Sequence, residues 1–147
     1  MPLRRKLKVP SADADFILAG ISCHLKDYRL VYNMNKKLGF DFKKLKDFVI
    51  YKQEDELKYS FYYYLDPDRQ KEYFFVSNHH PESKLIKELK QTDYFLVIKG
   101  EADNKNIITM IGKIGKIPGV LAAFRADHKK IRDFPLFIQD LELQMIE

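Results

Sequence analysis

The sequence contains a single cysteine, no tryptophan and no apolar run long enough to cross a membrane. Cys23 has no partner within the chain, which excludes an internal disulfide and favours a reducing compartment. The apolar run at residues 16–21 is far shorter than the ~20 residues that a bilayer-spanning helix needs. No apolar segment of the secretory type follows the basic residues between positions 4 and 8. We therefore expect a cytoplasmic protein without a membrane partner.

Aromatic residues, in contrast, are abundant, with nine Tyr and eleven Phe. Runs such as residues 61–64 and 73–75 suit the pleated, half-buried surface of a sheet. Hydrophobic residues make up 46% of the chain and charged residues 32%, which is typical of a folded protein rather than a disordered one. A length of 147 residues suits one domain with its own core, so we predict a single domain over residues 1–147.

Apolar residues at helical spacing predict a first helix over residues 23–38. Ser22 precedes it as an N-cap candidate, and Gly39 follows it as a stop. The pattern predicts that Tyr28 packs in the core between this helix and the sheet. The apolar positions are Leu25, Tyr28, Val31, Tyr32, Met34 and Leu38. The other side of the helix carries Lys26, Arg29, Asn33, Lys36 and Lys37.

Strands are predicted on both sides of this helix by alternation, apolar runs and turn residues. Their expected ranges are 6–9, 48–52, 57–65 and 72–78. The last three are expected to form a meander, with the turn residues Asp66-Pro67-Asp68 between the second and the third. The short apolar run at 16–21 fits either a strand or a helix by periodicity, and we favour a strand there. A short helix over residues 82–90, opened by Pro81, is expected to follow.

The C-terminal part of the chain has the clearest pattern. A strand at 93–98 is followed by isoleucines at helical spacing from Ile107, a Pro118-Gly119 break and a strand at 120–126. This order is one half of a ferredoxin-like unit. Residues 137–143 fit either a strand or a helix. We therefore predict an α+β fold, with a mainly antiparallel sheet, helices packed on one face and a ferredoxin-like βαβ half at the C-terminal side.

Two segments resemble the bacterial IPExxxVDY family. Residues 86–94 read Ile-Lys-Glu-Leu-Lys-Gln-Thr-Asp-Tyr, with Lys87 where the family name has proline and Thr92 where it has valine. Residues 20–30, followed by Asn35, are similar to that family's N-terminal pattern. The resemblance covers nearly the whole chain. It implies a small bacterial protein without an assigned activity and therefore supplies no catalytic residues.

The residues of the motif themselves indicate a structural role. Ile86 and Leu89 are expected to pack a helix onto the sheet. A carboxylate at the start of a strand commonly caps a turn through backbone hydrogen bonds, and we expect this of Asp93.

Few residues could carry metal or catalytic chemistry. The adjacent pairs Cys23-His24 and His79-His80 do not offer two ligands from one side of a strand, and zinc sites use spaced pairs. A helix N-terminus would lower the pKa of the Cys23 thiol, although a small residue packed under the sheet is the simpler interpretation. We predict no catalytic, metal or cofactor site.

Two other segments resemble nucleic-acid-binding motifs. Gly112 and Gly115 match the Gly-x-x-Gly loop of KH domains, but the isoleucine spacing runs through both, which favours a helix whose glycines allow close approach to the sheet. Residues 71–76 partly match the RNP1 strand of RNA-recognition motifs, whose aromatic side chains stack on bases. Because Tyr73 and Phe75 alternate with Phe74, one of these two sets is expected in the core.

The formal net charge of +5 keeps nucleic acid and anionic surfaces open as partners. The candidate anion or nucleic-acid contacts are Lys26, Arg29, Lys36, Lys37, Lys43 and Lys44. A basic surface of this size also occurs as a merely solvated face. The first expectation is a non-enzymatic binding or assembly module, for example a homodimer formed through sheet edges or through the aromatic-rich surface. The alternative is an RNA-binding protein that uses the basic helix face and the N-terminal arm.

Overall fold

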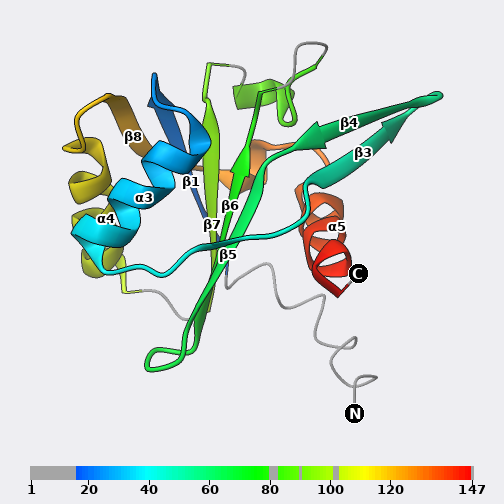
Figure 1. Ribbon diagram of the computed structural model, residues 1–147. Coiled ribbons are helices and arrows are strands. Elements are labelled where there is room, and N and C mark those ends of the chain that lie inside the picture. Colours follow the sequence, from blue (N-terminus) through cyan, green and yellow to red (C-terminus); the bar gives the residue numbers. More distant parts are fainter. Residues whose placement is uncertain (1–15, 80–82, 90, 101–102, 147) are drawn as a thin grey trace.

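The computed structural model describes residues 16–79, 83–89, 91–100 and 103–146 (Figure 1). The strands are β1 (Phe16–Cys23), β2 (Lys43–Lys44), β3 (Phe48–Lys52), β4 (Asp55–Tyr59), β5 (Phe61–Asp66), β6 (Lys71–Ser77), β7 (Tyr94–Lys99) and β8 (Val120–Ala126). The helices are α3 (Asp27–Leu38), α4 (Asn104–Gly115) and α5 (Phe134–Ile146), with short 3₁₀ turns η2 (Lys87–Leu89) and η3 (His128–Lys130). The strand expected at 6–9 lies outside the described residues.

Six strands form the main sheet in the order β2-β5-β6-β7-β1-β8. Every neighbouring pair in this sheet is antiparallel. Strands β7 and β8 are therefore parallel to each other, with β1 between them and α4 connecting them. Strands β3 and β4 form a separate hairpin. The predicted α+β class with a mainly antiparallel sheet is confirmed.

The sheet is covered on both faces. Side chains alternate in direction along each strand, and here apolar side chains point to both faces, so both need a covering layer. Ile17, Ala19 and Ile21 of β1 belong to the core under α3 and α4, whereas Phe16 and Leu18 belong to the core that includes residues of α5 and the β3–β4 hairpin. The prediction had helices on one face only. The structure differs in placing α5 on the opposite face from α3 and α4 (Figure 1).

Helix α3 begins four residues later than predicted, at Asp27. Ser22 and Cys23 instead extend β1, where they pair with β8. The predicted end is confirmed, since Gly39 adopts a left-handed conformation with φ of 77° and its N–H donates to the Asn35 carbonyl oxygen. The prediction for Tyr28 is wrong: its side chain is 61% exposed. The buried side of the helix consists of Leu30, Val31 and Met34.

The structure corrects the predictions for two segments, 57–65 and 82–90, and decides between strand and helix for a third, 137–143. The strand expected at 57–65 is two strands that separate at Ser60, with β4 paired to β3 and β5 paired to β6. Within the described part of 82–90, the only helical turn is η2 at 87–89. The ambiguous segment 137–143 lies within helix α5.

Helix α4 runs continuously through Gly112 and ends at Gly115, so the two glycines do not form the loop of a KH domain. Asp103 caps its first turn by accepting from the N–H of Lys105. No heavy atom lies within 4 Å of where a Gly112 Cβ would stand, and the nearest to Gly115 is Ala123 Cβ at 3.9 Å. The expected close approach to the sheet is therefore wrong for Gly112. It is Gly20 in β1 that permits a close contact, because a Cβ there would lie 2.5 Å from the Phe124 ring.

These glycines give a matched pair of substitutions. Gly112→Ala removes backbone freedom from the unfolded chain without a clash, and we expect it to stabilise the protein by about 0.8–1 kcal/mol. Gly20→Ala forces Phe124 away from β1, and we expect a loss of roughly 1–3 kcal/mol. Urea denaturation of both variants measures the two free energies of unfolding. Destabilisation by Gly112→Ala would contradict a continuous helix α4.

Candidate functional site

The outer side of helix α3 combines aromatic and basic side chains. With Leu30, Val31 and Met34 turned inward, the i, i+4 spacing places Tyr28, Tyr32 and Lys36 in one outer row. The adjacent row consists of Arg29, Asn33 and Lys37. Both tyrosine side chains are 61% exposed, and the Lys36 Nζ lies 5.7 Å from the centroid of the Tyr32 ring.

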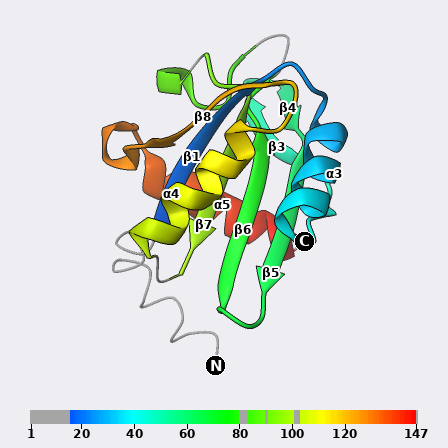
Figure 2. The ribbon, with the colours of Figure 1, turned by 90° about the vertical axis from the view of Figure 1, so that its left-hand side faces the viewer.

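Helix α4 extends this surface. It lies beside α3 on the same face of the sheet (Figure 2). We define the α3–α4 basic face by seven exposed cations, and none of them forms an ion pair with another described residue. They are Lys26, Arg29, Lys36, Lys37, Lys105, Lys113 and Lys116. Their charge is therefore free to act on a partner.

Two of the six predicted contact residues lie outside this face. The Lys43 Nζ is 3.4 Å from an Asp41 carboxylate oxygen. The Lys44 Nζ lies 3.7 Å from Asp27 and 3.9 Å from Asp47, and it also stands 5.1 Å from the centroid of the Tyr62 ring. These two lysines are compensated within the fold, whereas Lys26, Arg29, Lys36 and Lys37 are not.

Asp27 is the one acidic residue of α3, and it is turned toward the sheet. Its Oδ2 accepts a 2.8 Å hydrogen bond from the Tyr62 hydroxyl. Partial burial favours the neutral form of this carboxyl, but hydrogen bonds from Tyr62 and Ser60 and the charge of Lys44 outweigh that effect and lower its pKa. Burial raises the pKa of Tyr62, and its hydrogen bond to Asp27 adds to this effect. Asp27 therefore fixes the start of α3 and leaves the outer side basic.

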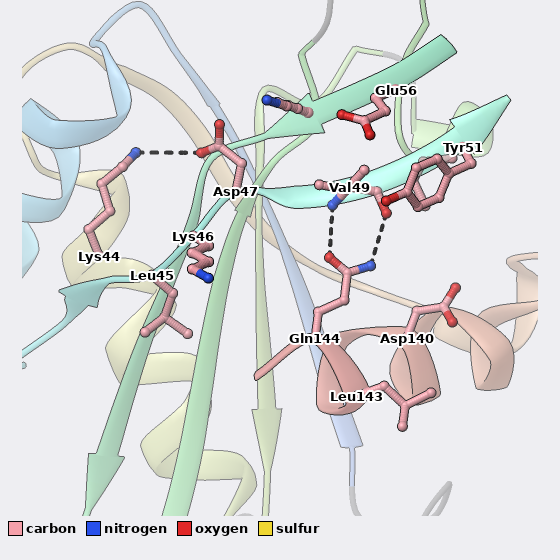
Figure 3. Close-up of a pocket in the computed structure, with 12 residues that line it drawn as sticks. Lys44, Leu45, Lys46, Asp47, Val49, Tyr51, Glu56, Asp140, Leu143 and Gln144 are labelled. Atoms are coloured by element: carbon pink, nitrogen blue, oxygen red, sulfur yellow. Dashed lines mark hydrogen bonds and ion pairs between the residues drawn. The ribbon is translucent and has the colours of Figure 1, made fainter. Parts of the chain in front are cut away.

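A groove of about 970 Å³ lies on the other side of the molecule, between α5, the β3–β4 hairpin and the segment before β3 (Figure 3). Gln144 of α5 crosses to the edge of β3, where its side chain accepts from the Val49 N–H at 2.8 Å and donates to the Val49 carbonyl oxygen at 2.9 Å. The charged lining residues are Lys44, Lys46, Lys58, Asp47, Glu56 and Asp140. Because the two signs balance, this groove has no preference for a polyanion.

The segment that resembles the IPExxxVDY motif is held by a buried amide that the sequence did not single out. Asn78 is 0% exposed. Its Nδ2 donates to the carbonyl oxygens of Leu89 at 3.0 Å and Thr92 at 2.9 Å, and its Oδ1 accepts from the Ile86 N–H at 2.7 Å. These bonds replace the helical bonds expected over 82–90.

Three acidic or aromatic residues of this segment, Glu88, Asp93 and Tyr94, also make structural contacts. Asp93 Oδ2 accepts from the Cys23 N–H at 2.7 Å, which fixes the end of β1 against β7. The Tyr94 hydroxyl donates to the Leu25 carbonyl oxygen at 2.7 Å. Glu88 Oε2 accepts from the Arg132 N–H at 3.0 Å. Asp93 therefore accepts a backbone hydrogen bond as expected, but the donor belongs to the distant end of β1 and not to a turn beside Asp93.

Removing the Asn78 amide tests this description. Asn78→Ala removes the described side-chain partner of two backbone groups, the Ile86 N–H and the Thr92 carbonyl oxygen, whereas the Leu89 carbonyl oxygen still accepts from the Thr92 N–H. Each unsatisfied group costs about 1–3 kcal/mol, so we expect a loss of at least about 2 kcal/mol. The control is Asn33→Ala, because among the described residues the Asn33 amide bonds only to the Arg29 carbonyl oxygen within α3. Thermal unfolding of both variants measures the difference, and equal melting temperatures would refute the role of Asn78.

The residues considered for catalysis are engaged in packing or in local pairs. Cys23 is buried in the core under α3. Burial raises the pKa of its thiol, and the charge of Asp93 adds to this, against a hydrogen bond from the Leu25 N–H. The favoured interpretation, a small residue packed under the sheet, is confirmed for Cys23. The alternative of a helix N-terminus that lowers the thiol pKa does not apply, because Cys23 lies in β1 and not at the start of α3. His79 pairs through Nε2 with Asp93 on the surface.

The described residues also bear on a metal site, on base stacking by the RNP1-like strand and on a membrane span. The described part of the chain holds no group of three His, Cys, Asp or Glu side chains arranged for a metal ion. Tyr73 and Phe75 are buried on one face of the sheet and Phe74 on the other, so no aromatic side chain of the RNP1-like strand is exposed for stacking. None of the described helices is long and apolar enough to cross a membrane.

Known proteins do not supply a function for these surfaces. A scan against protein families found no match, and a search of curated proteins found no relative.

Proposed function

We propose that the protein is a non-enzymatic binding module for nucleic acid and that it binds through the α3–α4 basic face. The observation that carries this proposal is the set of seven exposed cations without described ion pairs, on two adjacent helices. A phosphate backbone is the polyanion whose repeating charge matches such a surface. The groove between α5 and the hairpin is the less suitable site, because its charges balance.

The affinity of such a site comes from the release of counterions from the nucleic acid. Each neutralised phosphate adds about 0.7–0.9 to the slope of log affinity against log salt. Binding is therefore expected at low salt and is expected to weaken steeply as salt rises.

Two sets of charge reversals test the proposal. The first variant carries Lys36→Glu, Lys37→Glu, Lys113→Glu and Lys116→Glu, all on the basic face. The control carries Lys52→Glu, Lys58→Glu, Lys129→Glu and Lys130→Glu, which change the net charge equally on exposed positions elsewhere. Fluorescence anisotropy with a mixed-sequence RNA, between about 50 and 200 mM salt, measures both affinity and salt slope.

We expect the first variant to lose most of its affinity. We also expect its slope of log affinity against log salt to fall by about 3, because each of the four lysines contributes about 0.7–0.9 to that slope. The control is expected to keep its slope. Failure of the wild-type protein to bind at the lowest salt, or an equal loss in both variants, would refute the proposal.

Self-association is a second candidate function, favoured by the edge strand β8. This strand pairs only with β1 in the described sheet. Its exposed apolar side chains include Leu121, 65% exposed, and Phe124, 37% exposed. An uncovered apolar edge of this kind is a template for pairing with another strand. We expect a homodimer that Leu121→Lys converts to a monomer, as measured by light scattering. A monomeric wild-type protein would remove this candidate.

We also infer a ferredoxin-like fold and membership of a protein family. A ferredoxin-like core made of β1, α3, β6, β7, α4 and β8 is supported by the strand order β8-β1-β7-β6 and by the two helices on one face. Membership of the IPExxxVDY family is supported by the structural contacts of Ile86, Asp93, Tyr94 and Asn35, whose side chain holds Phe42 after α3. A cytoplasmic location stays a prediction from the single cysteine.

A further inference from the structure

Tyr28 and Tyr32 are large aromatic side chains that lie outside the described core, and the Lys36 Nζ stands over the ring of Tyr32. Neither ring packs against the core under α3, and neither lies against another described aromatic ring. Neither hydroxyl has a hydrogen-bond partner among the described residues. Two rings left 61% exposed on one row of a helix are therefore available to a ligand.

The charges around these rings indicate the chemistry of that ligand. Arg29 lies between the two tyrosines in sequence, and the Lys36 Nζ stands 5.7 Å from the centroid of the Tyr32 ring. No acidic side chain shares the outer rows of α3, since Asp27 is bound to Tyr62 and Lys44. Aromatic faces next to unpaired cations suit a base next to a phosphate.

The spacing of the rings selects the form of nucleic acid. Residues four apart on an α-helix are separated by about 6 Å along its axis. This exceeds the ~3.4 Å between successive bases of a stacked strand, so two neighbouring bases that each contacted one ring would have to be splayed apart. Bases in a duplex are stacked on one another, whereas those of a single strand can be splayed and stacked on protein rings.

We infer that the α3–α4 basic face binds single-stranded nucleic acid, with Tyr28 and Tyr32 each stacking on a base while Arg29 and Lys36 contact the flanking phosphates. This inference rests on the proposed function and adds the class of ligand to it. Duplexes would contact only the cations of the face and would not use the rings.

The double variant Tyr28→Leu/Tyr32→Leu tests the stacking, because leucine keeps helix propensity and apolar character but has no ring. We expect its affinity for single-stranded RNA to fall by at least about 20-fold, and its affinity for duplex RNA and for heparin to stay within about 3-fold of wild type. The double variant Tyr28→Phe/Tyr32→Phe keeps both rings and is expected to restore binding. Tyr51→Leu is the matched control, since Tyr51 is 72% exposed but lines the groove.

A direct readout is available because the protein contains no tryptophan. In Tyr32→Trp the single indole is expected to be quenched by single-stranded RNA and not by heparin, whereas in Tyr51→Trp neither ligand quenches it. A leucine double variant that binds single strands as wild type does would overturn the stacking inference. An equal loss for single strands and duplexes would also overturn it. In both cases the charge-reversal experiment still decides the proposed function separately.

Discussion

Strands β6 and β7 run through the middle of the main sheet, and their central residues are buried on both faces. Burial of two faces requires two covering layers, and this requirement accounts for the positions of the helices and of the β3–β4 hairpin. Helices α3 and α4 cover one face, and α5 with the β3–β4 hairpin covers the other. Because hydrophobic burial is the main favourable term in folding, these inner contacts fix which side of each helix is left to solvent.

The outer side of the α3–α4 layer is the feature that follows from this arrangement. Once Leu30, Val31 and Met34 are buried, α3 presents two tyrosines and three cations outward. The one carboxylate of the helix, Asp27, is drawn inward by Tyr62 and Lys44. On the other face of the sheet, the groove beside Gln144 is lined by side chains of both charges. The two faces of the molecule therefore differ in the partners that they suit.

Much of the fold is predictable from the sequence where one local pattern decides the outcome, as in α4 and at Gly39. The strand expected at 57–65 was not divided, because Leu57, Tyr59 and Phe61 continue the same alternation across the break. In the described part of 82–90, the structure has only the short turn η2 and not the expected helix. The hydrogen bonds from Asn78 that hold this segment join residues far apart in the chain, so the local sequence pattern does not indicate them. Tyr28 was assigned to the core because its spacing is helical. The aliphatic set Leu30, Val31 and Met34 was the better signal, since a tyrosine has a polar end that tolerates solvent.

The central claim is that nucleic acid binds the outer side of α3 and α4 and not the groove on the other face. Titration of ¹⁵N-labelled protein with a single-stranded RNA oligonucleotide, followed by amide chemical shifts, tests this most directly. The account predicts that the largest shifts occur at Tyr28, Tyr32 and Lys36 and along the outer side of α4, while Val49 and Gln144 stay unchanged. Shifts concentrated at Val49 and Gln144, or no shifts at low salt, would contradict it.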